Sequence, residues 1–323
     1  MKKVIRLLSL CLVASMVLGL AGCGAAKVTE APKEVVKKYV IGISPLTTQH
    51  EYYIGYLEGI KKAAKELNVE VMIVDPQWDV VKQTADIEDF IAKKVDAMIV
   101  SAVDPKGIKP ALEKAEKAGI PVISEMTKVE GIVPLVGTDQ IEGAELAGRY
   151  AGEWITKKYN GTADVAILNF PYFQNVLDRV TGFKKGLAAT APNAKIVADV
   201  DAKAKMETAM KTMEDVLQAN SNVKVIFGIN DDSAKGANAA FQATKLKPED
   251  ICILGFDADS GVRKLIKGNE FVKGSVAADT DIIGKACIET AIKKIKKETL
   301  PDWVRVEGAQ YLVNKENIDK YLK

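Results

Sequence analysis

The chain has 323 residues, with 45 Lys and Arg, 43 Asp and Glu and one His, so its formal net charge at pH 7 is +2. Without residues 1–22, which hold three of the cations and no acids, 42 cations face 43 acids and the net charge is −1. A nearly neutral body with mixed charges lacks the electrostatic footprint of a nucleic-acid-binding protein, so we expect no nucleic-acid partner.

The first 22 residues have the parts of a secretory signal. A basic head over residues 2–6 precedes an apolar run of about 14 residues over 7–20, and small residues follow it. A transmembrane anchor is the alternative, but a helix needs roughly 20 residues to span a bilayer. We therefore interpret residues 1–22 as a signal peptide.

Cys23 follows the signal directly, and Leu20-Ala21-Gly22-Cys23 resembles a bacterial lipobox, in which the Cys is lipidated and becomes the mature N-terminus. A Cys that carries two or more acyl chains anchors a protein stably. Residues 23–37 are poor in large apolar side chains and cannot bury enough surface to fold. We expect a lipidated Cys23 and a flexible tether, which hold an extracytoplasmic body at the outer face of the cell membrane or in the periplasm.

Four cysteines are present, of which Cys11 leaves with the signal and Cys23 carries lipid. Cys252 and Cys287 each stand in an apolar stretch, which favours two buried free thiols over a disulfide. One His and no Cys-x-x-Cys sequence argue against a zinc or iron site. We expect no metal and no cofactor.

The remaining chain, about 285 residues long, suggests two domains and repeats one plan. Each copy begins with an apolar strand, a polar loop and a helix, and further apolar strands follow at offsets near 123–131 residues. The matched strands are Val40–Ser44 with Val165–Asn169, Val69–Asp75 with Ile196–Asp201, Ala97–Asp104 with Val225–Asp231, and Ile120–Ser124 with Ile251–Gly255.

The strands are continuous apolar runs, and amphipathic helices such as Tyr56–Leu67 and Ile108–Ala118 lie between them. Such runs are typical of parallel strands that are covered on both faces. The alternation therefore predicts an α/β fold with two doubly wound parallel-sheet lobes. Ligands bind beyond the carboxyl ends of the strands in such sheets, so two facing lobes make a cleft.

Six short sequences occur in an order and spacing that resemble a known family. They are Tyr52-Tyr53, Gly119–Ile123, Gly137–Asp139, Asp178–Phe183, Gly228–Asp231 and Gly255–Asp257. From about Tyr39 to about Asn314 the chain resembles the ribose/galactose-type periplasmic binding proteins, the cluster B substrate-binding proteins of ABC sugar importers. The resemblance implies a type I fold with three hinge crossings, near Thr138, Ala278 and Glu307. The N-terminal lobe is then 38–138 plus 279–306, and the C-terminal lobe is 139–278 plus 307–323.

The resemblance also implies a sugar site. Tyr52 and Tyr53 match paired aromatics of the family's cleft, although core packing at a helix start is the alternative. His50 stands where the family often has a hydroxyl-binding Asn, and its direct role is left open. Arg179 matches a sugar-binding Arg, whose planar fork suits hydroxyls; the alternative is a solvated charge on a helix.

Asn230 and Asp257 end strands, as ligand residues of the family do, and Phe256 is the wall beside Asp257. Their alternative is a role as strand-end turn residues. Asp104 and Glu125 lie at strand ends on the same edge and are weaker candidates. The expected ligand-binding residues are His50, Tyr52, Tyr53, Asp104, Glu125, Arg179, Asn230, Phe256 and Asp257.

Other polar sequences have structural interpretations. Asp139 and Asp231 are interpreted as structural residues that stabilise the hinge and the start of a helix. Asp257–Gly261 resembles the opening of a calcium loop but lacks its later Gly and acid, so a turn that caps a helix is favoured. The Lys-rich helix Lys285–Lys297 is interpreted as a solvated face.

We expect a monomer that captures a sugar-like molecule for an ABC permease and is not an enzyme. No dinucleotide fingerprint, P-loop or nucleophile elbow is present. The alternative is a receptor module that presents a sensed ligand to a membrane signalling partner, and a transcription regulator would need a DNA-binding helix-turn-helix. Ribose is not the expected ligand, because Met126 and Thr127 stand where ribose binders carry an Asp-Arg pair.

Overall fold

The strands of residues 38–137, with one later strand added at the edge, form one sheet in the order β11-β5-β4-β3-β1-β2, and all its neighbouring strands are parallel. We describe residues 38–322 from a computed structural model, in which these residues belong to one compact unit. The strands of this sheet, sheet A, are β1 (Val40–Ser44), β2 (Glu70–Ile73), β3 (Ala97–Val100), β4 (Val122–Glu125), β5 (Leu135–Gly137) and β11 (Trp303–Arg305).

The second sheet, sheet B, has the order β12-β10-β9-β8-β6-β7. Its strands pair in parallel except for β12, which runs antiparallel to β10. They are β6 (Asp164–Asn169), β7 (Lys195–Asp201), β8 (Val223–Gly228), β9 (Cys252–Asp257), β10 (Val272–Ala278) and β12 (Gln310–Asn314). The central strands are buried along almost their whole length, because helices cover both faces.

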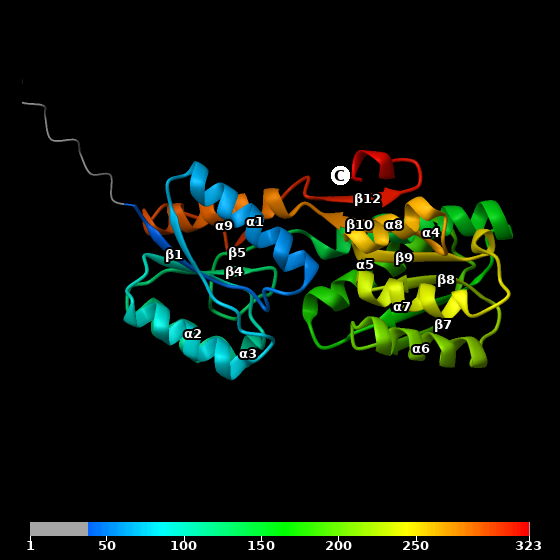
Figure 1. Cartoon of the computed structure of the whole chain (residues 1–323), viewed down its shortest axis with the longest axis horizontal. Helices are drawn as coiled ribbons and strands as arrows, with labels where there is room; N and C mark the ends of the chain where they lie inside the picture. The colour runs from blue at the N-terminus through cyan, green and yellow to red at the C-terminus, as the bar shows by residue number, and fades with distance from the viewer. Residues whose placement is uncertain (1–37, 323) are drawn as a thin grey trace, which may run out of the picture. The chain divides into compact units, whose positions relative to one another are not determined.

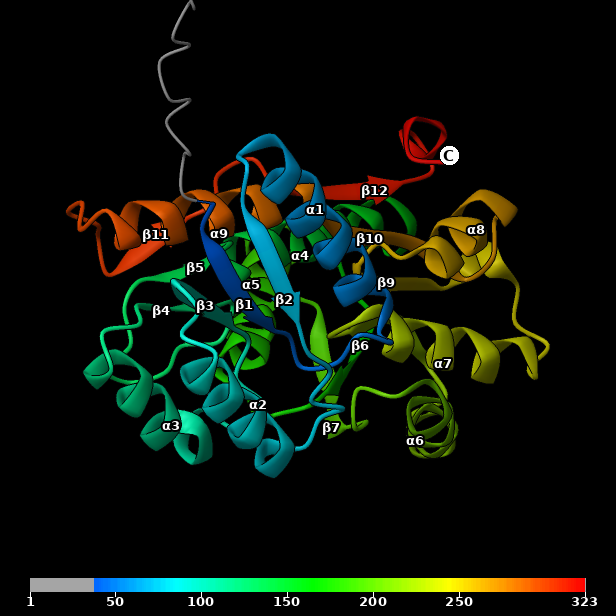
Figure 2. The same cartoon turned by 60° about the vertical axis from the view of Figure 1, so that its left-hand side comes forward.

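Helices cover both faces of sheet A, as Figures 1 and 2 show. On one face α1 (Glu51–Glu66) packs against α9 (Thr280–Ile295), and on the other α2 (Val80–Ala92) packs against α3 (Pro105–Lys117). Asp79, Asp104 and Asp279 start three of these helices, and each carboxylate accepts hydrogen bonds from backbone N–H groups of the first turn. Polar residues at the ends of strands thus often serve the next helix.

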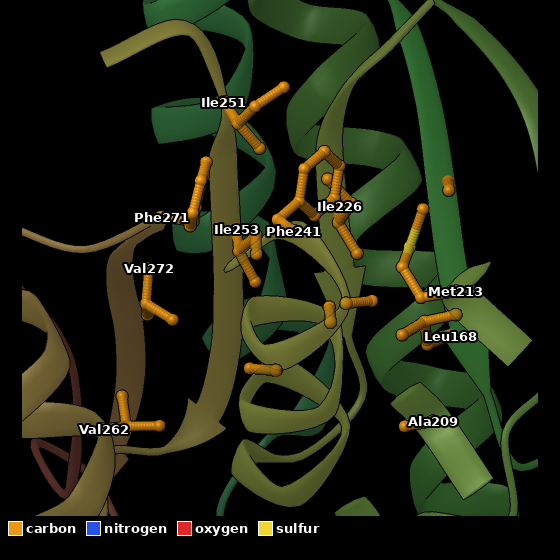
Figure 3. Packing of buried hydrophobic residues seen from close by; sticks show 14 of the residues in the cluster. Leu168, Ala209, Met213, Ile226, Phe241, Ile251, Ile253, Val262, Phe271 and Val272 are labelled. Carbon is orange, nitrogen blue, oxygen red and sulfur yellow. The ribbon is translucent and has the colours of Figure 1, made fainter. Parts of the chain in front are cut away.

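Sheet B has the same arrangement, with α4 (Gln140–Tyr159) and α5 (Gln174–Thr190) packed together on one face. On the other face lie α6 (Met206–Ala219), α7 (Asp231–Gln242) and α8 (Ser260–Gly268). Figure 3 shows the core beneath them, where Ile226 and Ile253 of the sheet meet Phe241 of α7. Short 3₁₀ turns at Pro248–Asp250 and Ile318–Lys320 complete the secondary structure of the described residues.

Glycines allow α4 and α5 to approach one another closely. A Cβ atom on Gly182 would lie 2.1 Å from the carbonyl oxygen of Ile141, and one on Gly148 would lie 2.1 Å from that of Phe183. Neither helix backbone can yield to such a contact, so only glycine fits at these positions. The approach fixes where α5 presents its other side chains.

The chain passes between the two sheets after β5, after β10 and between β11 and β12. At the first passage Asp139 caps α4, and Arg305 of β11 pairs with its carboxylate at 3.3 Å. The expected pair of doubly wound α/β lobes is confirmed. The predicted signal peptide, the lipidation at Cys23 and the tether lie outside the described residues.

Several local interpretations can be compared with the structure. Asp259 caps α8 through the N–H of Val262, so the sequence after Asp257 forms a helix cap, as favoured over a calcium loop. Cys252 and Cys287 are buried and free, and they belong to different apolar clusters. Within residues 38–322, every helix is too short or too polar to cross a bilayer.

Candidate functional site

A cavity of about 120 Å³ lies where the carboxyl ends of strands from both sheets meet. Its walls come from the segments after β1, β2 and β4 of sheet A and after β6, β7, β8 and β9 of sheet B. This is the edge at which doubly wound sheets bind ligands. Its lining residues are Leu46, His50, Tyr52, Tyr53, Trp78, Met126, Thr127, Phe170, Phe173, Asn175, Val176, Arg179, Ala204, Ile229, Asn230 and Asp257.

The first turn of α1 positions two tyrosines in the wall. His50 caps this helix, since its Nδ1 accepts a hydrogen bond of 3.3 Å from the backbone N–H of Tyr52. The rings of Tyr52 and Tyr53 meet edge to face, with 5.1 Å between their centroids. Tyr53 is only 7 % exposed and also packs in the apolar cluster of sheet A. Core packing and a place in the cavity wall are therefore combined in one residue.

Glu125, at the end of β4, lies behind Tyr52 and outside the cavity lining. The Tyr52 hydroxyl donates to its Oε1 at 3.0 Å, and the Ser101 hydroxyl donates to its Oε2 at 2.5 Å. Burial raises the pKa of Glu125 to about 7, although both hydrogen bonds act in the opposite direction. In this geometry the carboxyl group orients Tyr52 and does not itself face the cavity.

Arg179 of α5 enters the cavity wall with most of its guanidinium group already held. Its Nε donates to Oε1 of Gln140 at 2.7 Å, and its Nη1 donates to the carbonyl oxygen of Ile229 at 2.8 Å. The guanidinium lies over the ring of Phe256, with Cζ 3.9 Å from the ring centroid. Nη2 makes no hydrogen bond to any described residue. A rigid cation thus keeps a free donor for a ligand.

Asp257, at the end of β9, faces Arg179 without a direct hydrogen bond. The two groups are 3.8 Å apart, from Oδ1 to Nη1, and both side chains are 11 % exposed. Burial raises the pKa of Asp257, and the positive charge of Arg179 opposes that shift. No donor among residues 38–322 reaches the Asp257 carboxylate within hydrogen-bonding distance. A polar ligand could satisfy both groups at once.

Two asparagines in the wall have contrasting environments. Asn230 caps α7: its Oδ1 accepts from the N–H and the hydroxyl of Ser233, and its Nδ2 donates to the carbonyl of Ala204. Its amide is therefore largely occupied. The buried Oδ1 of Asn175, in contrast, has no partner among the described residues. A buried acceptor without a donor is costly, and a ligand hydroxyl would satisfy it.

Besides Glu125, two more of the nine expected ligand residues do not line this cavity, namely Asp104 and Phe256. Asp104 is exposed, and its carboxylate accepts a hydrogen bond of 3.0 Å from the N–H of Lys106, so it caps α3. Phe256 is completely buried beneath Arg179, where it supports the guanidinium and does not face the cavity. The structure brings the other six, His50, Tyr52, Tyr53, Arg179, Asn230 and Asp257, together at the wall.

Sequence reasoning missed several residues of the wall, above all the aromatic ones. Phe170 and Phe173 follow β6 directly, and Trp78 follows β2. The rule that ligands bind at the carboxyl ends of parallel strands was a signal that could have found them. Gln140, which accepts a hydrogen bond from Arg179, could not be found by this rule. It comes near Arg179 only because α4 packs against α5.

Backbone strain gathers at the same wall. Trp78, Met126, Ala204 and Asp257 have φ values of 63°, 54°, 54° and 113°, in the region that favours glycine. Each such residue costs of order 1–3 kcal/mol and persists where its surroundings dictate the conformation. Strain of this kind clusters at ligand sites, which supports a binding role for the cavity.

Comparisons with known proteins agree with this geometry. The model of a family described as "Periplasmic binding protein domain" matches residues 41–299. The ribose import binding protein RbsB of Bacillus subtilis is 30 % identical over 260 residues, which cover 79 % of this chain and 81 % of that protein.

Two solved structures are also similar to this chain. One is an ABC transporter periplasmic solute binding protein from Actinobacillus succinogenes with bound D-allose, at 28 % identity and a TM-score of 0.77, covering 88 % of this chain and 100 % of that one. The other is an ABC transporter solute binding protein from Mycobacterium smegmatis with bound glycerol, at 27 % identity and a TM-score of 0.79, covering 89 % and 98 %.

Proposed function

The chain belongs to the periplasmic binding protein domain family, of the ribose/galactose type, and on this premise we propose that it captures a sugar or sugar-like molecule for an ABC importer. The carrying observation is that one cavity combines aromatic walls with a cation and a carboxylate whose hydrogen-bonding capacity is not used up. Flat apolar walls suit the C–H faces of a sugar ring, and the Arg179–Asp257 pair suits neighbouring hydroxyl groups.

The charges of the wall favour a neutral ligand. Arg179 and Asp257 balance one another, and His50 is the other titratable group at the wall apart from the two tyrosines. A charged ligand would leave one charge of the pair uncompensated in a buried site, which is expensive. A polyhydroxylated ring gives both groups hydrogen bonds and leaves the charge balanced.

Residues from both sheets line the cavity. We therefore propose that the two lobes close around the ligand to capture it. Contacts from both sides are complete only when the lobes are together, so the ligand shifts the population toward the closed form. Among the contacts that join the two sides, the N–H of Ser260 donates to Oε1 of Glu51 at 2.7 Å. We propose that this hydrogen bond helps to hold the closed form.

The relatives are import binding proteins, and this family acts outside the cytoplasm. We extend this to a protein that is not an enzyme, acts as a monomer and delivers its ligand to an ABC permease. Residues 1–22 as a signal peptide and Cys23 as a lipid anchor complete the proposal, supported by the lipobox-like sequence. A sensory receptor of the same fold is the second candidate, and genes for a permease and an ATPase beside this one would favour import.

A ligand panel tests the function. Native mass spectrometry of freshly purified protein should find a co-purified small molecule, and a thermal-shift panel of pentoses, hexoses, polyols and amino sugars should raise the melting temperature with at least one of them. Calorimetry then measures its affinity. Binding of amino acids or peptides from a comparator panel, with no response to any sugar or polyol, would contradict the proposal.

A further inference from the structure

An outer groove opens from the cavity and is several times larger than it. Its volume is about 710 Å³, against about 120 Å³ for the cavity. Five residues line both spaces, so the cavity and the groove adjoin at them: His50, Trp78, Phe170, Ala204 and Asn230. A ligand that fills the cavity can therefore continue into the groove.

Trp78 forms one side of this passage and is fixed there without being buried. It is 51 % exposed, and its φ of 63° stands next to a φ of 57° at Gln77. Left-handed backbone is costly for a bulky residue. The loop is nevertheless tied down, because the N–H of Trp78 donates to the carbonyl of Leu46 at 2.9 Å and the Asp75 carboxylate accepts from the N–H of Gln77 at 3.3 Å. The backbone that carries the indole is thus held in place, while about half of the residue's surface remains exposed.

Phe170, from the other sheet, contributes a second aromatic ring to the passage. Its ring lies 5.0 Å from that of Tyr172 and 5.7 Å from that of Phe173, centroid to centroid, and these neighbours restrict its motion. Aromatic residues from both lobes therefore lie where the cavity and the groove adjoin. A ligand ring that lies between Trp78 and Phe170 would contact their apolar faces. A ligand that offered only hydroxyl groups would not need such faces.

The lining of the groove also includes a donor that makes no ion pair with the described residues. Lys203 pairs with Asp201 at 2.5 Å, and Asp232 pairs with Lys235 at 2.7 Å. Lys205 also lines the groove and makes no ion pair with any residue of the described chain. Its ammonium group can donate to a hydroxyl or carboxylate of a ligand that reaches this far.

We propose that the natural ligand has two rings: a polyhydroxylated ring in the cavity, and a second ring whose flat apolar face lies against Trp78 in the outer groove. The inference rests on the proposed function and specifies its ligand class. The second ring is either another sugar residue or an aromatic group, as in an aryl glycoside or a nucleoside. Both present a flat apolar face to an indole, so the experiment separates them.

Calorimetry compares each single-ring probe with matched two-ring probes. Glucose is paired with maltose, cellobiose and p-nitrophenyl glucoside, galactose with lactose and p-nitrophenyl galactoside, and ribose with adenosine. We expect at least one two-ring probe to bind roughly tenfold or more tightly than its single-ring counterpart, as an aromatic contact of this size provides. A gain with the disaccharides identifies a second sugar, and a gain with only the aryl glycosides or adenosine identifies an aromatic group.

Two variants assign that gain to Trp78. Trp78→Asn removes the ring but keeps a residue that tolerates left-handed backbone, so the loop should be preserved. It should abolish the gain, whereas Trp78→Phe should retain much of it. Because Trp78 also lines the cavity, the gain is measured in each variant against that variant's own single-ring binding. Trp303→Ala is the matched control, because this half-exposed tryptophan lies on β11 and lines neither space.

The outcomes separate this inference from the function on which it rests. Single-ring sugars that bind as tightly as every two-ring partner, or a gain that survives in Trp78→Asn, would overturn the second subsite and leave sugar capture standing. No binding of any probe, in a panel that also contains the free pentoses, hexoses and polyols, would overturn both.

Discussion

Gln140 accepts a hydrogen bond of 2.7 Å from Nε of Arg179, and this contact links the ligand-facing guanidinium to the start of α4. The amide nitrogen of Gln140 donates in turn to the hydroxyl of Thr138 at 2.8 Å, in the segment where the chain leaves sheet A. The orientation of Arg179 thus depends on the geometry of a crossing between the sheets. Binding and the relative placement of the two sheets are connected through three side chains.

Replacing Gln140 by Leu should weaken ligand binding by about 1.5–3 kcal/mol, because Arg179 loses the acceptor that orients it. The measurement is calorimetry with whichever sugar the panel identifies. Gln174→Leu is the control, since Gln174 lies on the exposed start of α5 and its amide donates a hydrogen bond to Asp178. Equal affinity in the wild type and in Gln140→Leu would show that Arg179 needs no such support.

Asp257→Asn should separate binding from stability. The substitution removes a charge-assisted acceptor and should cost on the order of 1.5–3 kcal/mol of ligand affinity, as should Arg179→Ala. Because burial raises the pKa of Asp257, its charged form is less stable in the fold than in the unfolded chain. The unliganded variant should therefore be at least as stable as the wild type in denaturant unfolding at pH 7. A large loss of stability with unchanged ligand affinity would show that Asp257 supports the fold and does not bind the ligand.

Glu125 should make stability depend on pH. Its pKa lies at about 7 in the fold and near 4.5 when unfolded, so between these values the folded protein binds a proton that the unfolded chain does not. The free energy of unfolding should therefore fall as pH rises from 4.5 to 7, by on the order of 3 kcal/mol, and this contribution should be level outside that window.

The matched variant for this effect is Glu125→Gln, which keeps a neutral group beside Tyr52 and Ser101. Urea unfolding at several pH values should show a shallower slope between pH 4.5 and 7 for the variant, with the largest gain relative to the wild type above pH 7. Parallel curves for the two proteins would mean that Glu125 does not titrate in this window.

Closure should depend on the contact between Glu51 and Ser260. Glu51→Ala removes the acceptor for the N–H of Ser260 and should weaken ligand binding by about 0.5–1.5 kcal/mol, because we propose that this hydrogen bond helps to hold the closed form. Small-angle scattering should show a smaller radius of gyration with saturating ligand than without it. Glu58→Ala is the control, since Glu58 is an exposed residue of the same helix that pairs with Lys61.

An unchanged scattering profile on ligand addition, with binding confirmed by calorimetry, would contradict closure itself. A normal compaction with unaltered affinity in Glu51→Ala would contradict only the role of this contact.

Ribose should not be the tightest ligand among the sugars. Met126 and Thr127 line the cavity, where neither side chain offers the charged fork and carboxylate of the Asp-Arg pair that ribose binders carry in these places. A site built for hydroxyl groups discriminates strongly when its partners change. A calorimetric series over pentoses, hexoses, polyols and amino sugars checks this, and ribose as its tightest member would overturn the prediction.

The lobes and their order could be predicted from the sequence because buried parallel strands must be apolar along their length. The repeated runs around Val40–Ser44 and Val165–Asn169 predicted β1 and β6 to within one residue at each end. Polar residues after such strands pointed to the edge of the sheets where His50, Arg179 and Asp257 line one cavity. The spacing of apolar residues and the direction of a strand depend on local sequence, so both can be predicted without a structure.

Tertiary structure alone decided which polar strand-end residue faces the cavity. Asp104 and Asp257 both end strands in the sequence, yet Asp104 turns to cap α3 while Asp257 is held opposite Arg179. Glu125 and Phe256 are likewise separated from the cavity by Tyr52 and Arg179, which lie in front of them. Local sequence is the same for a cap and for a ligand residue, because both need a polar group at the end of a strand. Only the packing of α4 on α5 and the meeting of the two sheets determine which group is left without a protein partner.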